Sequence, residues 1–473
     1  MIENANARQL FHDALSGRSN RRDVIKRAAA LGISAPVIAA LAQAAHVASV
    51  QAATEGTLSV TYYDWILNLH PSIDAVNTDF KKTFPLDPYV APTAGFSTDR
   101  FIQETRDKTS TWDAYIGVTP FLEMIQFVEA GTIEPWDPYL PAGFLDNLPD
   151  SIKAEGTYNG SLYVWPVFLD VIVQAWNGDL VEKAGLDPSV APKNWDEYLA
   201  NAKAVVDSGA APFGCTFDFH AWRSLIPITH SISTDVYEEN GLFKWNSDPA
   251  VQALEIMKRM MEYANPDVLS EGTSDAGVNQ TPDEQAFAST RVAYYVKYQN
   301  APMRFAATWP DPSKLGLAAL PVQEGGAGGT VFWDTGAVLL TYGTNKQQAA
   351  NYINAMTNDQ RLWKESVAGD PDNGVSPVGQ LPVYKSIWDE YTATPPDWLT
   401  ANPWATSIWN GLPNASAIHP TKLAITQFNI AAPFFSKYLS GDISDPKDAL
   451  TQAYDAVNAE FEAQGGASAT PVP

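Results

Sequence analysis

The chain of 473 residues contains a single cysteine, Cys215, so no disulfide bond can form within it. A lone thiol in such a chain usually behaves as a small buried apolar residue. With 45% apolar residues, the chain is long enough to bury the cores of two or three domains. We therefore expect its stability to come from packing.

Basic residues are also few: 30 Lys and Arg stand against 54 Asp and Glu, which gives a net charge of −24. Such an acidic surface repels nucleic acids and anionic membranes. We expect neither as a partner and attribute the acidity to solubility.

The motifs of common catalytic and metal sites are missing. None of the six histidines falls in HxH or HExxH spacing, and no GxSxG sequence is present. The glycine-rich stretch Glu324–Gly329 is not followed by GK[ST] and predicts a loop, not a phosphate site. We expect no metal, cofactor or catalytic residue, although the many carboxylates leave a glycosidase-like pair arithmetically possible.

The N-terminus lacks a long unbroken apolar run. Residues 19–45 are interrupted by Gly32 and Pro36 and are too polar for a membrane anchor. The sequence RRDVIK at Arg21–Lys26 resembles a twin-arginine export signal, and no cysteine for lipid attachment follows it. We expect residues 1–53 to direct export to a periplasmic, extracellular or cell-surface location. The alternative is a short amphipathic helix of a cytoplasmic protein.

After the signal, strand and helix patterns alternate, which predicts an α/β fold with largely parallel sheets flanked by helices. The expected strands lie in 57–65, 112–118 and 315–322, and the expected helices in 72–84, 100–110, 121–131, 194–207 and 249–264. A helix followed by a strand is expected in 284–300, and a strand followed by a helix in 336–358. The last hundred residues read as helical and proline-rich, with a disordered tail at 463–473.

Tryptophan is abundant, and all fifteen Trp residues follow residue 53. A pyranose ring has C–H faces and a rim of hydroxyls, so a sugar site needs aromatic faces together with carboxylate or amide groups. Trp112, Trp136, Trp195 and Trp363 lie within helix or strand patterns and are expected in the core.

The order of segments resembles the extracellular solute-binding proteins of bacterial ABC importers, in particular the carbohydrate-type family that includes maltodextrin-binding proteins. The resemblance covers about Thr57–Phe461 and includes YNGSLYVWPVFLDVIVQAWNGDLVEKAGLD followed by PKNWDEYLANAKAV. The residues that occupy the family's pattern are Gly160, Tyr163, Pro166, Asn177, Asp179, Gly185, Trp195 and Glu197.

The resemblance implies a type II periplasmic-binding-protein-like fold with two lobes and an added helical C-terminal region. We expect the first lobe in 54–167 and 321–357 and the second in 168–320 and 358–462. It also implies a monomer that captures a sugar or oligosaccharide between the lobes without chemical turnover. Closure of the lobes would then allow recognition by the permease subunits of the transporter.

Asp170 raises a question, because it stands alone in the apolar stretch Tyr163–Leu180. An unpaired charge is costly in a buried strand. The resemblance places Trp165–Asp170 in the first crossing between lobes, where Asp170 would line the ligand cleft; the alternative is a carboxylate paired within the core.

Open α/β sheets bind ligands beyond the carboxyl ends of their strands, and this rule together with the resemblance gives the candidate ligand-binding residues. They are Asp64, Trp65, Thr119, Trp165, Asp170, His220, Trp222, Tyr298, Gln299, Trp333, Asp334 and Trp409.

Two alternatives remain for the function. Aromatic walls with Asp64, Asp170 and Asp334 would also suit a polyamine or another small cation. An exported glycan-degrading enzyme would likewise be acidic and rich in Trp.

Overall fold

The computed structural model describes residues 56–91, 99–270, 281–323 and 329–465. The expected export signal and disordered tail therefore lie almost wholly outside the described residues. Among the described residues, no helix is both long and apolar enough to cross a lipid bilayer.

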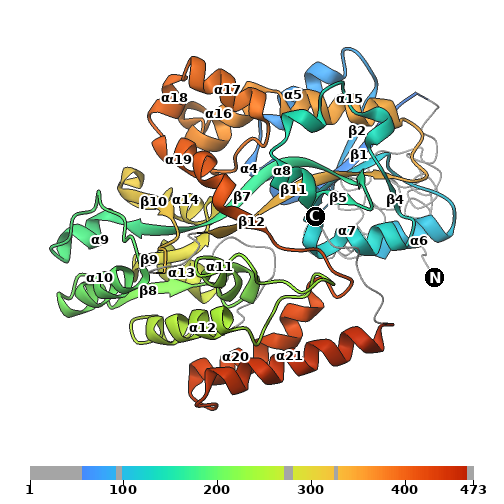
Figure 1. The fold of residues 1–473 in the computed structure, drawn as a ribbon. Coiled ribbons are helices and arrows are strands. Elements are labelled where there is room, and N and C mark those ends of the chain that lie inside the picture. The colour runs from blue at the N-terminus through green and yellow to red at the C-terminus, as the bar shows by residue number, and fades with distance from the viewer. Residues whose placement is uncertain (1–55, 92–98, 271–280, 324–328, 466–473) are drawn as a thin grey trace, which may run out of the picture.

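One mixed sheet of ten strands runs through the molecule, with the strand order β2-β1-β3-β11-β7-β9-β8 along its main path (Figure 1). Its strands are β1 (Leu58–Tyr63), β2 (Leu86–Ala91), β3 (Ala114–Val118), β4 (Ile133–Glu134), β7 (Val164–Asn177), β8 (Phe213–Phe217), β9 (Val292–Tyr298), β10 (Leu315–Ala319), β11 (Thr330–Leu340) and β12 (Ala415–Ala417). Pairing is parallel between β1 and its neighbours β2 and β3 and between β8 and β9, but antiparallel around β7.

Strand β7 joins two lobes. Its first half pairs with β11, from Val164 opposite Val338 to Val171 opposite Phe332. Its second half pairs with β9 and β10, from Ile172 onward. All fourteen residues are buried, which explains why this stretch of the sequence is almost uniformly apolar.

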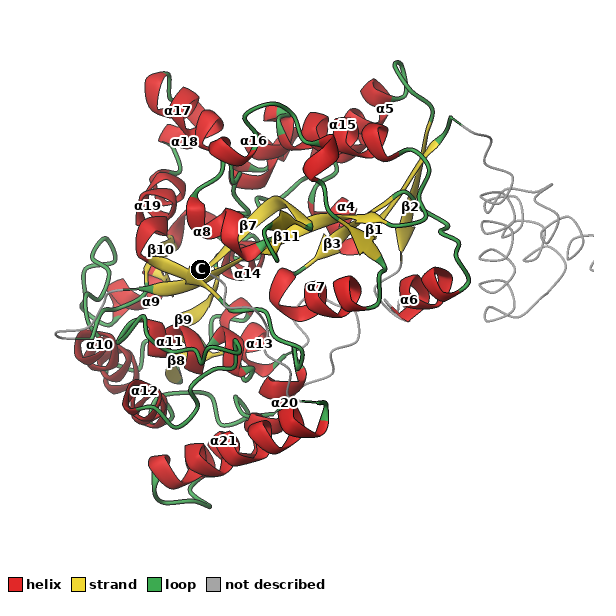
Figure 2. Ribbon diagram, turned by 45° about the vertical axis from the view of Figure 1, so that its right-hand side comes forward, coloured by secondary structure: helices red, strands yellow, loops and turns green. Residues whose placement is uncertain are grey.

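Helices cover both faces of each part of the sheet (Figure 2). Those of the first lobe are α4 (Asp64–Leu69), α5 (Ile73–Phe80), α6 (Asp99–Arg106), α7 (Pro120–Glu129), α8 (Asp150–Glu155), α15 (Lys346–Thr357), α16 (Gln360–Ala368), α17 (Lys385–Ala393), α18 (Asp397–Thr400) and α19 (Pro403–Gly411). Those of the second lobe are α9 (Gly178–Lys183), α10 (Trp195–Asp207), α11 (Leu225–His230), α12 (Asp248–Met260), α13 (Pro282–Ala288), α14 (Asn300–Ala306), α20 (Thr426–Ser440) and α21 (Pro446–Ala463).

Local sequence sets the helix ends. The Asn194 side chain accepts the Glu197 N–H at 2.8 Å and caps α10, as the sequence predicts. Helix α7 starts with Pro120 at its first position, where the missing N–H costs nothing. The Glu123 carboxylate reaches back to the Thr119 N–H at 3.1 Å, so the turn between β3 and α7 is fixed on both sides.

The C-terminal region divides between the lobes, in contrast to the expectation that all of 358–462 belongs to the second. Residues from Leu362 to Ala415 pack into the first-lobe core, and those from Ile418 to Phe461 pack into the second-lobe core. Figure 1 accordingly shows α16–α19 beside α5 and α15, and α20–α21 beside α12. Helical periodicity in the sequence predicts an apolar face but does not say which core will cover it. We therefore define the first lobe as residues 58–171 and 330–417 and the second as 172–323 and 418–463.

Candidate functional site

An aromatic cluster lies where the two lobes meet. It consists of Phe121, Trp222, Tyr298 and Trp333, whose rings contact one another edge to face. The ring centroids are 5.4 Å apart for Phe121 and Trp222, 5.1 Å for Trp222 and Trp333, and 5.5 Å for Tyr298 and Trp333. Three of these four residues were predicted as ligand contacts from the sequence.

The carboxyl ends of strands from both lobes supply Phe121, Trp222 and Tyr298, whereas Trp333 lies near the amino end of β11. Phe121 stands in the first turn of α7, just after β3, and Tyr298 is the last residue of β9. Trp222 lies in a short 3-10 helix, Ala221–Arg223, that follows β8. Phe121 belongs to a first-lobe helix but packs with the second-lobe core. The cluster therefore joins the lobes at the edge where the strand-end rule predicts a ligand.

Phe121 was missed by the sequence analysis, which named Thr119 at the end of β3. Thr119 is the N-cap residue of α7, and Phe121 follows it two positions later. The sequence could have identified Phe121, because the rule that ligands bind beyond the carboxyl ends of strands applies to the first turn of the following helix as well as to Thr119.

Arg223 gives the cluster a cation. Its guanidinium carbon lies 4.0 Å from the centroid of the Trp222 ring and 5.0 Å from that of Tyr298, within the range of a cation–π interaction. Its Nη1 donates to Asp218 at 3.1 Å. Sequence reasoning missed Arg223, because a single Arg beside a Trp carries no recognisable motif.

Asp218 forms an ion pair with Arg223 and holds the guanidinium in position. The carboxylate is buried and also binds the Lys297 ammonium and the Nδ1 atom of His220, the latter at 2.7 Å. Burial alone would raise the pKa of Asp218, but Lys297 and Arg223 outweigh it and hold that pKa well below its usual value. Lys297, which has no exposed surface, also contacts Asp283 at 2.8 Å.

Two donors in the cluster have no acceptor. The Trp222 indole N–H and the Arg223 Nε–H are buried and make no hydrogen bond within the described part of the chain. Buried donors without an acceptor are costly, so a ligand oxygen at this position would be stabilised by them. The ring centroid of His220 lies 6.5 Å from that of Trp222, and 38% of the His220 side chain is exposed. His220 therefore adds a polar, partly exposed group beside the cluster.

Asp170 is paired inside the protein, which is one of the two arrangements that the sequence left open. It is 2% exposed, and its two oxygens accept from the amides of Asn300 at 2.5 Å and Gln380 at 2.7 Å. The Gln380 oxygen in turn contacts Nε2 of His70 at 2.8 Å. Burial raises the pKa of Asp170 to about 6. Each carboxylate oxygen accepts a hydrogen bond from the protein and the residue is buried, so it does not line a ligand surface here.

Asp334 also lies in the protein interior. It accepts the Val167 N–H at 2.7 Å, its own N–H donates to Glu155, and burial raises its pKa well above the usual value. Gln299 binds the β7 backbone, accepting from the Val171 N–H at 2.5 Å and donating to the Leu169 carbonyl at 2.8 Å.

The remaining predicted residues lie apart from the cluster or beyond what can be described. Trp165 is fully buried in the first-lobe core and donates to the Tyr384 hydroxyl at 2.8 Å. Trp409 lies on α19 and stacks on Trp388. Asp64 and Trp65 begin α4 instead of ending a strand, and their side chains are outside the described part of the structure.

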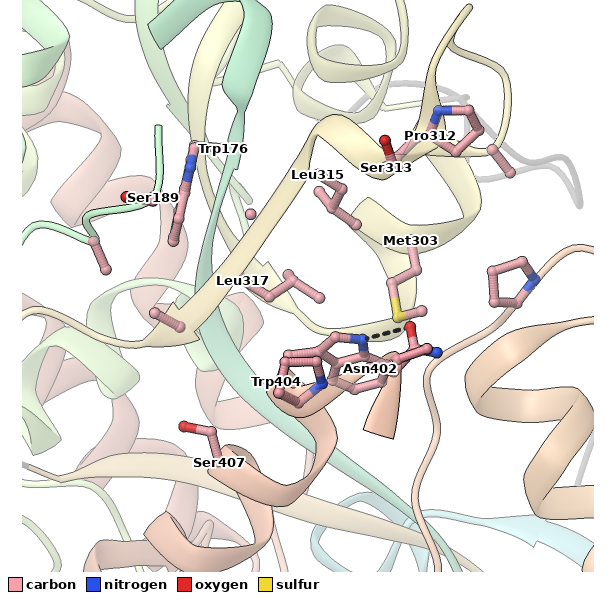
Figure 3. A pocket seen from close by; sticks show the side chains of 18 residues that line it. Trp176, Ser189, Met303, Pro312, Ser313, Leu315, Leu317, Asn402, Trp404 and Ser407 are labelled. Atoms are coloured by element: carbon pink, nitrogen blue, oxygen red, sulfur yellow. Dashed lines mark hydrogen bonds between the residues drawn. The ribbon is translucent and has the colours of Figure 1, made fainter. Parts of the chain in front are cut away.

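A separate cavity of about 710 Å³ also touches both lobes (Figure 3). It lies between β10 and α14 on one side and α19 on the other, and Figure 3 shows Leu317, Met303 and Trp404 around it. None of the predicted residues whose side chains are described lines this cavity. Because its walls are not the carboxyl ends of parallel strands, it does not satisfy the rule that selected the cluster.

Comparison with known proteins identifies the family. Residues 119–361, a little over half of the chain, match the family of bacterial extracellular solute-binding proteins. The chain belongs to this family. Its members are binding proteins, in agreement with the resemblance seen in the sequence.

Individual relatives of this solute-binding protein are distant. A binding protein of Brucella abortus is 23% identical over 327 residues, which cover 67% of this chain and 75% of that protein. The sn-glycerol-3-phosphate-binding periplasmic protein of Agrobacterium fabrum is 28% identical over 167 residues, 34% of this chain and 38% of that protein.

Solved structures show the same fold, and the fold predicted from the sequence is confirmed. The GacH receptor of Streptomyces glaucescens, solved unliganded and with acarbose, matches with a TM-score of 0.67 and 17% identity over 86% of this chain and 98% of its own. The cyclic α-maltosyl-1,6-maltose binding protein of Arthrobacter globiformis gives a TM-score of 0.66 and 21% identity over 86% of this chain and 99% of its own. At these identities the likeness establishes the fold alone.

Proposed function

We propose that this protein is the extracytoplasmic substrate-binding component of an ABC importer and captures a neutral sugar or oligosaccharide between its lobes. The aromatic cluster carries the proposal, because it combines rings from both lobes with unpaired donors at the carboxyl ends of the strands. Sugar rings suit such a site, since their C–H faces pack on aromatic rings and their hydroxyls accept hydrogen bonds. The acarbose receptor and the maltosyl-maltose binding protein share this fold and support the choice of ligand.

The mechanism is closure of the lobes around the ligand. Phe121 moves with the first lobe and Trp222 with the second, so only the closed form can place both against one ligand. Ligand binding would then favour the closed form by the difference in contacts. The permease subunits would recognise the relative placement of the two lobes, and the expected export to a periplasmic or extracellular location places the protein beside them.

Calorimetry against a panel of neutral mono- and oligosaccharides tests the proposal. Trp222→Ala should weaken the binding of the tightest-binding sugar by at least about tenfold, because a central aromatic contact is lost. Trp222→Phe, which keeps a ring, should lose less affinity. The matched control is Trp404→Ala, because Trp404 lines only the cavity of Figure 3. If Trp404→Ala weakens binding and Trp222→Ala does not, the sugar binds in that cavity and the proposed site is wrong.

An acidic or phosphorylated polyol is the second candidate, and Arg223 favours it. A guanidinium beside an unpaired indole N–H would bind a carboxylate or phosphate well. Relatives of this chain in Agrobacterium fabrum and Brucella abortus are named as sn-glycerol-3-phosphate-binding proteins. Binding of an anion should weaken steeply as salt rises, whereas binding of a neutral sugar should hardly change.

The structure weakens the case for a cationic solute. Asp170 and Asp334, which would have bound the ammonium group, are buried and hydrogen-bonded to the protein. Arg223 would repel a cation placed in the cluster. The enzyme alternative predicts release of reducing ends from polysaccharide, and a reducing-sugar assay distinguishes it from binding without turnover.

A further inference from the structure

A second cavity with aromatic walls lies on the outer corner of the first lobe, formed by α17, α18 and α19. Its volume is about 520 Å³, and we refer to it as the corner cavity. Its lining residues are Trp388, Tyr391, Thr392, Pro395, Leu399, Thr400, Pro403, Thr406, Ser407, Trp409 and Asn410. None of them belongs to the aromatic cluster between the lobes, so the two sites are distinct.

One wall of the corner cavity is aromatic and held in place. The rings of Trp388 and Trp409 stack with centroids 5.0 Å apart and planes 10° from parallel. The Trp388 indole N–H donates to the Pro382 carbonyl at 2.9 Å, and the Tyr391 hydroxyl donates to Gln360 at 2.5 Å. Trp388 is buried, but Trp409 remains partly exposed, so a fixed aromatic surface faces the cavity.

The polar groups of the corner cavity come from one face of α19. Pro403, Thr406, Ser407 and Asn410 recur at the three- and four-residue spacing of a helix face, and all four line the cavity. The side chains of Thr406, Ser407 and Asn410 make no hydrogen bond to other described residues. Two hydroxyls and one amide are therefore available to a ligand beside the aromatic wall.

Among the residues that the structure describes, no charged side chain lines the corner cavity. An anion would find no basic group there and a cation no carboxylate. A purely apolar ligand would leave the hydroxyls and the amide of α19 without partners, which is unfavourable. A ring with an apolar face and a hydroxyl rim satisfies both walls at once.

We propose that the corner cavity is a second saccharide-binding site, which takes a neutral pyranose unit of a glycan independently of the site between the lobes. Because all of its walls belong to the first lobe, binding there does not require lobe closure. Such a site would hold the protein on a polysaccharide while the junction between the lobes remains free to capture its own ligand.

The test uses the mature protein with three defined probes: maltoheptaose, cellohexaose and laminarihexaose, followed by calorimetry and tryptophan fluorescence. In the Trp222→Ala background, which removes the proposed junction site, at least one probe should still bind. Adding Trp409→Ala should weaken this binding by about tenfold or more. Adding Trp404→Ala should leave it unchanged, because Trp404 is on the same helix but lines the other cavity.

A second variant covers the case in which Trp409→Ala does not fold. Thr406→Val with Asn410→Leu keeps the volume of the α19 face but removes its polar groups, and it should weaken the same probe several-fold. The proposal is overturned if no probe binds the Trp222→Ala protein. It is also overturned if adding Trp409→Ala and adding Trp404→Ala change the affinity for the probe equally. Failure of the proposed site between the lobes would give a different result, because the Trp222→Ala protein would then bind every probe with the affinity of the wild type.

Discussion

Asp170 shows how burial changes a single residue in this protein. Its carboxyl group lies in the crossing strand, and two side-chain amides take the place of water around it. Amides stabilise the ionised form only in part, so burial dominates and the pKa rises from 3.8 to about 6. The folded protein therefore holds this proton at a pH where the unfolded chain has lost it.

Asp170→Asn should remove a pH-dependent part of the stability. The folded-state pKa lies above that of the unfolded chain, so the wild-type contribution is fully present below about pH 4 and is lost as the pH rises to about 6. The free energy of unfolding of the wild type should fall relative to the variant by about 1.4 kcal/mol per pH unit over this window. Urea unfolding of both proteins at pH 4, 5, 6 and 7 measures the difference. Parallel stability curves would mean that Asp170 does not titrate there.

Lys297 is the other residue whose chemistry depends on its surroundings. It has no exposed surface, yet Asp218 and Asp283 raise its pKa above the usual value despite burial, so it stays charged. A buried charge of this kind is tolerated only with partners. The ion pairs under Arg223 therefore fix the position of the cation that the aromatic cluster presents.

At the scale of elements, strand β10 depends on close approach to the ring of Trp176. Gly316 lies against this ring, and an added Cβ atom would be 1.9 Å from Cε2 of Trp176. The ring cannot move freely, because its indole N–H donates to the Pro188 carbonyl at 2.9 Å. This packing forms one end of the cavity in Figure 3.

Gly316→Ala should therefore destabilise the protein by about 1–3 kcal/mol, the usual cost of forcing an extra group into a packed region. Gly411→Ala at the end of α19 is the control, since no atom of the described residues beyond its immediate surroundings in the helix lies within 4 Å of its added Cβ. That variant should be neutral or slightly stabilising, by up to about 1 kcal/mol. Thermal and urea unfolding measure both. Equal stabilities of the two variants would show that Trp176 yields without cost.

For the whole molecule, the division into two lobes is observed, whereas export from the cytoplasm is proposed. The fold and family establish a solute-binding protein of the extracellular type. The route of export is a proposal that rests on the RRDVIK sequence at Arg21–Lys26.

Replacing Arg21 and Arg22 together by Lys should strongly reduce export, because a twin-arginine signal depends on both guanidinium groups. The control replaces Arg8 and Arg18 by Lys, which keeps the same charge but leaves the pair intact. Fractionation of cells and immunoblotting measure the exported share. Undiminished export of the Arg21/Arg22 variant would exclude this route.

The sequence by itself determined the alternation of strands and helices, the two-lobe class and the sheet edge to which the candidate ligand residues were assigned. These features depend on local periodicity and on strand ends; the strand-end rule also named Thr119, Trp222 and Tyr298, which stay predicted ligand contacts. Only the tertiary structure decided which polar groups remain available. Asp170, Gln299 and Asp334 stand at suitable positions along the chain, but each is buried and accepts a hydrogen bond from a residue distant in sequence, such as Gln380 for Asp170.

The assignment of helices to lobes was likewise decided in three dimensions. An apolar helix face in 362–415 fits either core equally well as a sequence pattern, and it is the packing of α16–α19 on the first lobe that selects one. The same packing takes Trp409 away from the junction and stacks it on Trp388, because tertiary contacts, and not spacing along the chain, determine which aromatic rings meet.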